Sequence, residues 1–161
     1  MLKRNVLRVA AAAAIAGLAA CATTPQPVTV ADAIARTPEL STLSALIDKA
    51  GLTETLRGAG PYTVFAPTND AFKSVAPEAL AKLAEDREAL KGVLLFHVLP
   101  AKVPAAEVAI GSVKSVQGEP LALAKAGTFV TVEDAVVQTA DIAATNGVIH
   151  VIDRVLMPPK R

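Results

Sequence analysis

Up to about residue 100, the hydrophobic residues recur mostly with the three- to four-residue spacing of helices. The clearest set follows Thr37-Pro38-Glu39, a typical helix start, and consists of Leu40, Leu43, Leu46, Ile47 and Ala50. The same spacing predicts helices over residues 30–36, 52–57, 77–84 and 86–99, and one around Phe72. A strand is expected over 62–66, ended by Pro67.

After Pro104 the pattern changes to short strands separated by turn residues. They are predicted over 113–116, 121–124, 129–132, 136–142 and 148–156. The last of them is apolar on both faces, which is typical of a central strand covered on both sides. Asn146-Gly147 before it is a turn signal, because both residues tolerate a positive φ. The fold class is therefore α+β with a mainly antiparallel sheet.

The first 20 residues have a pattern of their own. Residues 1–8 contain three basic residues and no acid, and residues 9–20 are an uncharged, alanine-rich run. This run is shorter than the about 20 apolar residues that cross a bilayer. An amphipathic or buried helix is the alternative, but no polar face interrupts the run. We expect an export signal over residues 1–20.

Cys21 is the only cysteine and directly follows Leu18-Ala19-Ala20. An unpaired cysteine in an exported protein pairs with another chain, stays free or is modified. The four residues resemble the bacterial lipobox, which implies that Cys21 is acylated and becomes the mature N-terminus. Two or more acyl chains anchor a protein stably. An aspartate at position 22 would favour the inner membrane, so Ala22 implies the outer membrane. Residues 21–28 are expected to form a tether.

Removal of residues 1–20 changes the net charge from +1 to about −2, with 13 basic and 15 acidic residues left. This balance gives no basic surface for nucleic acid. The chain has no tryptophan and one tyrosine, Tyr62, which argues against an aromatic platform for carbohydrate. About 130 remaining residues are enough to fold around one core without disulfides.

Two segments resemble the signatures of fasciclin domains: residues 62–72, YTVFAPTNDAF, and residues 146–158, NGVIHVIDRVLMP. Between them, Phe96-His97-Val98-Leu99 lies where the family carries a Tyr-His segment. The chain is identified as a member with a single fasciclin domain over residues 28–159. The resemblance implies a wedge of two small, mainly antiparallel sheets with several helices around it. It also implies adhesion outside the cell, or, as in a few relatives, carriage of a hydrophobic molecule such as a carotenoid.

Most of the signature residues are expected to stabilise the fold. They are Pro67, Thr68, Asn69, Phe72, Asn146, Gly147, His150 and Asp153. Pro67 ends a strand, Asn69 caps a helix and Phe72 buries its ring against the sheet. His97 and His150 lie at apolar positions, where a histidine is usually neutral and bonded to backbone or hydroxyl groups. His150 and Asp153 point to opposite faces of a regular strand, so they cannot form a catalytic pair within it.

No arrangement of residues along the chain indicates catalysis or a metal site. Histidine and carboxylate residues lack ligand spacing, and no serine lies in a Gly-x-Ser-x-Gly motif. The acidic pairs at 85–86 and 133–134 are typical of solvated turns. The sequence alone does not exclude a glycosidase-type pair of carboxylates assembled from distant residues. We predict that the protein is not an enzyme and has no cofactor.

The candidate adhesive contacts are Asp141, Ile142 and His97. In animal matrix relatives, an Asp-Ile pair before the second signature and the Tyr-His segment have been implicated in integrin recognition. Phe96 replaces the tyrosine, so only His97 carries over from that segment. The alternative is that Asp141 stabilises the turn at 145–147 while Ile142 belongs to the core. The predicted function is a lipid-anchored, non-catalytic envelope domain that binds a protein or polysaccharide, with its oligomeric state open.

Overall fold

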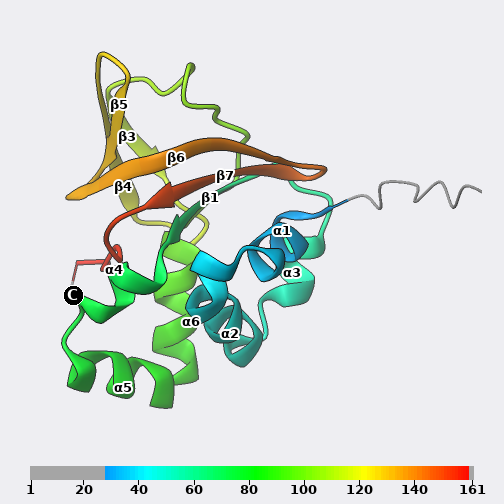
Figure 1. Cartoon of the computed structure of the whole chain (residues 1–161), viewed down its shortest axis with the longest axis vertical. Helices are drawn as coiled ribbons and strands as arrows, with labels where there is room; N and C mark the ends of the chain where they lie inside the picture. The colour runs from blue at the N-terminus through cyan, green and yellow to red at the C-terminus, as the bar shows by residue number, and fades with distance from the viewer. Residues whose placement is uncertain (1–27, 160–161) are drawn as a thin grey trace, which may run out of the picture.

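The structure is a computed structural model that describes residues 28–159, and its first half is helical as the hydrophobic spacing predicts. The helices are α1 Val30–Arg36, the 3-10 turn η1 Pro38–Leu40, α2 Ser41–Ala50, α3 Thr53–Arg57, α4 Asn69–Lys73, α5 Pro77–Glu85 and α6 Arg87–Phe96. Figure 1 shows most of them gathered on one side of the sheet. Asp86 caps α6 by accepting hydrogen bonds from the backbone N–H groups of Glu88 and Ala89, both at 3.0 Å.

The strands are β1 Tyr62–Pro67, β2 Val98–Leu99, β3 Gly111–Lys114, β4 Pro120–Ala126, β5 Phe129–Val132, β6 Ala135–Ala144 and β7 Gly147–Ile152. The sequence did not predict β2, which follows α6 after His97 and has only two residues; the predicted helix over 86–99 was therefore too long. The predicted last strand was too long. The strand stops at Ile152, and the Asp153 carboxylate directly after it accepts the backbone N–H of Val136 at 2.8 Å.

The prediction of two small sheets is wrong, because the strands form one seven-stranded sheet in the order β2-β1-β7-β6-β5-β4-β3. β7 lies between β1 and β6 and pairs parallel with β1, so the sheet is mixed, while its other pairings are antiparallel. The backbone N–H of Val116, after β3, donates to the carbonyl oxygen of Val98 in β2 at 2.8 Å. The two ends of the sheet therefore meet, and the sheet nearly closes into a barrel.

The core has two parts on the two faces of β1 and β7. Val64, Ile149 and Val151 face the helices and pack with the buried residues of α1, α2, α3 and α6. Phe65 and Ile152 face the inside of the curled sheet, where they pack with residues such as Leu121. All six residues of β7 are buried, which confirms that this strand is central and covered on both sides.

Gly147 is required for a close approach of two strands rather than for a positive φ. The predicted turn is present at residues 145–146, although neither Asn146 nor Gly147 has a positive φ. A Cβ atom on Gly147 would lie 2.1 Å from the carbonyl oxygen of Tyr62, its partner in the parallel pairing. Only a residue without a side chain lets β7 begin beside β1.

Gly147→Ala is therefore expected to lower the free energy of unfolding by about 3 kcal/mol or more, because the backbone of β1 or β7 must move. Gly92→Ala in α6 is the matched control. Its added Cβ would meet only the side chain of Gln117, at 3.5 Å, so helix propensity should make it neutral or slightly stabilising. Urea unfolding of both variants measures the difference, and equal stabilities would contradict the assigned role of Gly147.

Candidate functional site

The two signature segments lie side by side in the middle of the sheet. Tyr62 pairs with Gly147, and the register continues to the pair of Pro67 with Ile152. Beside this pairing, polar side chains of β1, β6 and β7 bond to the segment 101–108. Of the candidate contacts, Asp141 is bonded to this segment, whereas Ile142 packs against the helix-side core and the His97 ring bonds to Val93 and Leu156.

The first signature fixes the helices. Pro67 is the last residue of β1, and the Thr68 hydroxyl caps α4 by accepting the backbone N–H of Ala71 at 3.2 Å. Asn69 does not cap its own helix. Its Oδ1 accepts the backbone N–H of Thr42 at 2.9 Å and its Nδ2 donates to the Pro38 carbonyl oxygen at 3.0 Å. Asn69 thus caps α2 from a distance, which the sequence did not predict.

Phe72 is buried, with 5% of its surface exposed, but it belongs to the helix-side core around α2 and α6. Its predicted burial is confirmed, and its ring contributes to the layer between helices and sheet. Together with Thr68 and Asn69 it makes the first signature a folding signature.

Asn146, in the second signature, connects three segments. Its Oδ1 accepts the backbone N–H of Val30 at 2.8 Å, and its Nδ2 donates to the carbonyl oxygens of Leu56 and Gly58 at 2.8 and 2.7 Å. Its own carbonyl oxygen accepts the backbone N–H of Tyr62 at 3.0 Å. A turn residue was expected here, and the same side chain also satisfies backbone groups at the ends of α1 and α3.

His150 is a buried connector in the centre of β7, with 1% of its surface exposed. Its Nδ1 accepts the backbone N–H of Asp141 at 3.2 Å, so the other ring nitrogen, Nε2, donates to the carbonyl oxygen of Val103 at 2.9 Å. The ring stacks on Phe65, with centroids 5.6 Å apart. Both nitrogens are bonded to backbone, as predicted for a structural histidine.

His97 directly follows α6 and has 2% of its surface exposed. Nδ1 donates to the Val93 carbonyl oxygen at 2.8 Å and Nε2 accepts the backbone N–H of Leu156 at 3.0 Å. Burial lowers the pKa of this imidazole from 6.5 to about 4. His97 therefore connects α6 to the segment after β7 and has no exposed ring atom to offer a partner. This geometry supports the structural interpretation rather than an adhesive contact.

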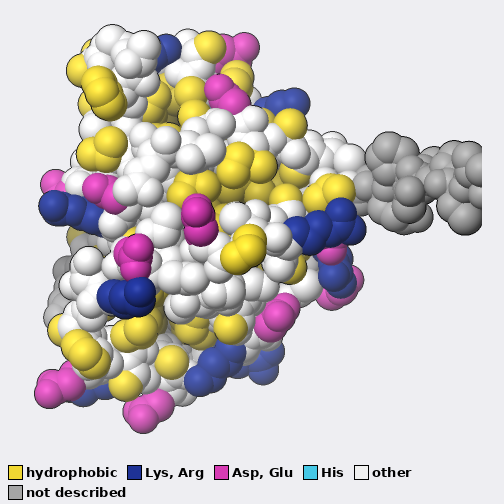
Figure 2. Space-filling model, in the orientation of Figure 1, with side chains coloured by type: hydrophobic (Ala, Val, Ile, Leu, Met, Phe, Trp, Pro, Cys, Tyr) yellow, Lys and Arg dark blue, Asp and Glu magenta, His cyan; other side chains and the backbone are white. Residues whose placement is uncertain are grey.

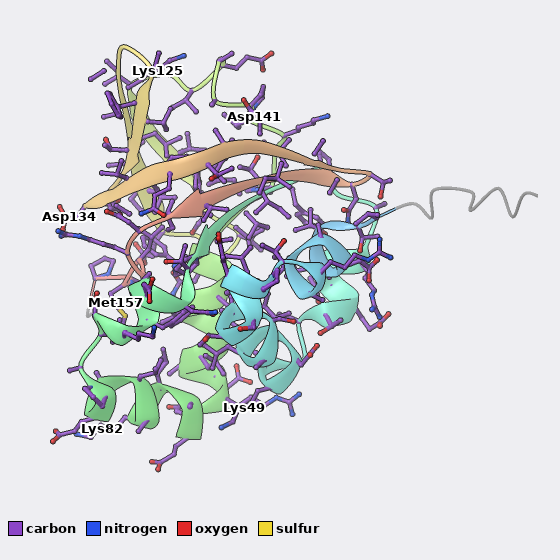
Figure 3. All side chains as sticks on the ribbon, in the orientation of Figure 1. Lys49, Lys82, Lys125, Asp134, Asp141 and Met157 are labelled. Carbon is purple, nitrogen blue, oxygen red and sulfur yellow. The ribbon has the colours of Figure 1, made fainter. Side chains whose placement is uncertain are left out.

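Asp141 is exposed and lies where β6 bulges between Thr139 and Ile142. It adopts a left-handed φ of 59°, one of two such non-glycine residues in the described chain. Its Oδ1 accepts the backbone N–H of Ala105 at 2.8 Å. The alternative that Asp141 stabilises the turn at 145–147 is wrong, because the bulge turns its carboxylate toward the segment 101–108 instead. Figure 3 shows Asp141 at the upper side of the molecule, below Lys125.

Ile142 is half-buried, packs against the helix-side core and pairs with Ile149. Its predicted core role is confirmed, so Asp141 and Ile142 have different environments although they are neighbours.

Asp153 accepts a hydrogen bond from Val136 and lies beyond the end of β7. Asp153 and His150 have separate partners, as predicted from their positions along the strand.

Four side chains from four strands hold the segment 101–108, which we call the strap. The Thr63 hydroxyl donates to the Ala101 carbonyl oxygen at 2.6 Å and accepts the backbone N–H of Val103 at 2.8 Å. Lys125 Nζ donates to the carbonyl oxygens of Ala105 and Ala106, both at 3.0 Å. The other two anchors are His150 and Asp141. Thr63 and Lys125 were not predicted as site residues, although a threonine inside an apolar strand is a usable signal.

Within residues 28–159, no group of three or more His, Cys, Asp or Glu side chains could hold a metal ion. None of the described helices is long and apolar enough to cross a bilayer. The predicted export signal and Cys21 lie outside the described residues.

The helical side has an apolar groove of about 600 Å³ between α2, α4 and α5. The residues that line it are Thr42, Asn69, Phe72, Lys73, Val75, Pro77 and Leu80. Figure 2 shows apolar side chains at the surface of the lower part of the molecule, where α5 lies. This groove is one place in the described chain where a hydrophobic molecule could be accommodated.

Comparison with known proteins gives one family. Residues 38–158 match the model of the fasciclin domain. Protein sll1483 of Synechocystis is 42% identical over 140 residues, which cover 86% of this chain and 78% of that protein. The immunogenic protein MPT70 of Mycobacterium tuberculosis is 33% identical over 81% of this chain and 69% of its own length. The transforming growth factor-beta-induced protein ig-h3 of Sus scrofa is 42% identical, but the match covers only 20% of it.

Among solved structures, a FAS1 domain pair from the insect cell adhesion molecule fasciclin I has a TM-score of 0.61 at 24% identity. The match covers 73% of this chain and 45% of the insect chain, and it supports the fold alone.

His97 should make the stability of the domain depend on pH. Below pH 6.5 the unfolded chain takes up a proton that the folded imidazole takes up only near pH 4. The free energy of unfolding should therefore fall by about 3 kcal/mol between pH 7 and pH 4 on account of this group, and no further below. Urea unfolding across this range, for the protein and for His97→Gln, isolates the contribution. A variant with the same pH dependence as the parent would contradict it.

Proposed function

The chain belongs to the fasciclin domain family, and on this premise we propose that it is a lipid-anchored interaction domain of the cell envelope. Fasciclin domain proteins are non-catalytic adhesion and secreted proteins, and the chain is not an enzyme. The proposed partner is a protein or a polysaccharide. The observation that carries the proposal is the exposed Asp141 carboxylate, held in a fixed position by the strap and by the bulge of β6.

The arrangement around Asp141 suits recognition because little conformational freedom is left to lose on binding. The backbone N–H of Asp141 is bonded to the buried ring of His150, and its carboxylate is bonded to Ala105. A carboxylate accepts several hydrogen bonds, so one bond to Ala105 leaves capacity for a partner's hydroxyl, amide or cationic group.

The proposed anchor would also orient the domain. Val28, the first described residue, accepts hydrogen bonds from the backbone and the hydroxyl of Thr145, at 2.9 and 3.2 Å, in the turn between β6 and β7. Seven residues, 21–27, precede it and span at most about 24 Å. A lipid on Cys21 would keep this turn near the membrane surface. Because Ala22 rather than an aspartate follows the cysteine, the proposed membrane is the outer one.

Carriage of a hydrophobic molecule receives less support. Sites for small apolar molecules usually bury 70–90% of the ligand in a concave pocket. The groove between α2, α4 and α5 lies at the surface and includes the polar residues Thr42, Asn69 and Lys73. Such a groove suits a side chain or short segment of a partner better than a carotenoid.

The anchor is tested with Cys21→Ser in the full chain. We expect the variant to move from the membrane fraction to the soluble fraction, because no acyl chain can be attached to it. Ala22→Ser is the control and should stay with the membrane. A Cys21→Ser variant that remains membrane-bound at the parent level would contradict the anchor. That result would not bear on the proposed contact through Asp141.

The binding site is tested with a photo-crosslinking amino acid at position 140, directly before Asp141, in cells that express the full chain. We expect an adduct of higher mass, reduced severalfold by Asp141→Asn, since the amide keeps the side-chain shape but loses the charge. The same probe at position 49, an exposed residue of α2, is the control. Equal adducts at both positions, or an adduct at 140 that is insensitive to Asp141→Asn, would refute contact through this carboxylate.

A further inference from the structure

The outward side of β4 and β5, together with Val136 near the start of β6, carries no charge, is apolar except for Thr131 and is largely open to solvent. The alternation in β4 is regular, with Leu121 and Leu123 buried and the residues between them exposed. The register places the exposed residues of β4 beside those of β5 and β6. Together they form a surface that we call the outer face, made of Ala122, Ala124, Ala126, Phe129, Thr131 and Val136.

Phe129 is 67% exposed and Val136 is 37% exposed, and Ile110, directly before the edge strand β3, is 77% exposed. Figure 2 shows apolar side chains gathered at the upper left, over the hairpin of β4 and β5. A contiguous apolar surface of this kind on a folded domain usually marks an interaction site. The alanine side chains are short, so a second sheet can approach this surface closely.

Charged residues flank the outer face on both sides, with opposite signs. Exposed Lys114 of β3 pairs with Pro120 of β4 and lies on one side. Glu133 and Asp134 form the turn between β5 and β6 on the other side. They are level with the same part of β4, because the backbone N–H of Glu133 donates to the Ala122 carbonyl oxygen at 2.8 Å and its carboxylate accepts the Ala122 N–H at 2.6 Å.

This pattern is self-complementary. A twofold axis that lies in the interface and runs along β4 exchanges the β3 side with the β5 side. It therefore places Lys114 of each copy opposite Glu133 and Asp134 of the other, so the favourable charge pair occurs twice. Since the outer face itself carries no charge, packing it against its own copy brings no like charges together. A polysaccharide or a nucleic acid would instead require polar, aromatic or basic groups on this surface, and its six residues offer one threonine and one phenylalanine.

We propose that the outer face binds a second copy of this chain in a symmetric dimer, with β4 on the axis and Lys114 opposite Asp134 across the interface. The inference goes beyond the proposed function and does not depend on the lipid anchor. It also leaves the turn between β6 and β7 outside the interface.

The test uses Ala124→Cys in the full chain, because a residue on the axis lies close to its own copy. After mild oxidation of membranes from expressing cells, we expect a band of twice the chain mass that disappears on reduction. Ala143→Cys, at another exposed alanine on β6 away from the outer face, is the matched control and carries the same Cys21 background. No dimer band with Ala124→Cys, an equal band in both variants, or a band with a different protein would overturn the proposal.

Charge exchange tests the orientation in the Ala124→Cys background. Lys114→Asp and Asp134→Lys should each lower the dimer yield about fivefold, since each disrupted pair occurs twice. The double variant should restore the yield, because the opposite charges face each other again. If the double variant is as weak as the single ones, the proposed symmetric arrangement is refuted. Membrane fractionation of Cys21→Ser and adducts at position 140 are independent of these results.

Discussion

The parallel pairing of β1 with β7 is the constraint on which the rest of the structure depends. These strands are separated by about 80 residues of sequence, yet Tyr62 and Gly147 approach so closely that no side chain fits at position 147. The pairing divides the core into a helix-side part and a part inside the curled sheet. It also aligns the two fasciclin signatures, which together build one central pair of strands.

The polar groups that follow from this pairing act mainly as connectors. His97 and His150 each use both ring nitrogens on backbone groups, and Asn146 bonds to three segments. Buried donors and acceptors that are all satisfied stabilise one arrangement over its competitors. Of these three residues, His150 bonds to both the strap and the bulge at Asp141, through the Val103 carbonyl oxygen and the backbone N–H of Asp141.

The two proposed surfaces place different demands on the chain. Asp141 offers a charged group on a preorganised backbone and suits a polar partner. The outer face offers short apolar side chains between opposite charges and suits a copy of itself. A membrane anchor would raise the effective concentration of both kinds of contact, since tethered domains meet far more often than free ones. Envelope attachment, partner binding and self-association are therefore compatible in one small domain.

The sequence by itself determined the helices, most strands, the central position of the last strand and the structural role of both histidines, because hydrophobic spacing reports which face of an element is buried. It also carried the family, through segments 62–72 and 146–158. Only the tertiary structure decided that the strands form one sheet, that Asn69 caps α2, and that Asp141 holds the strap rather than the nearby turn. Each of these depends on a contact between residues that are distant in the sequence, or on a local bulge. Hydrophobic spacing cannot encode such contacts or bulges, since it describes the faces of one element and not the partners that folding brings to that element.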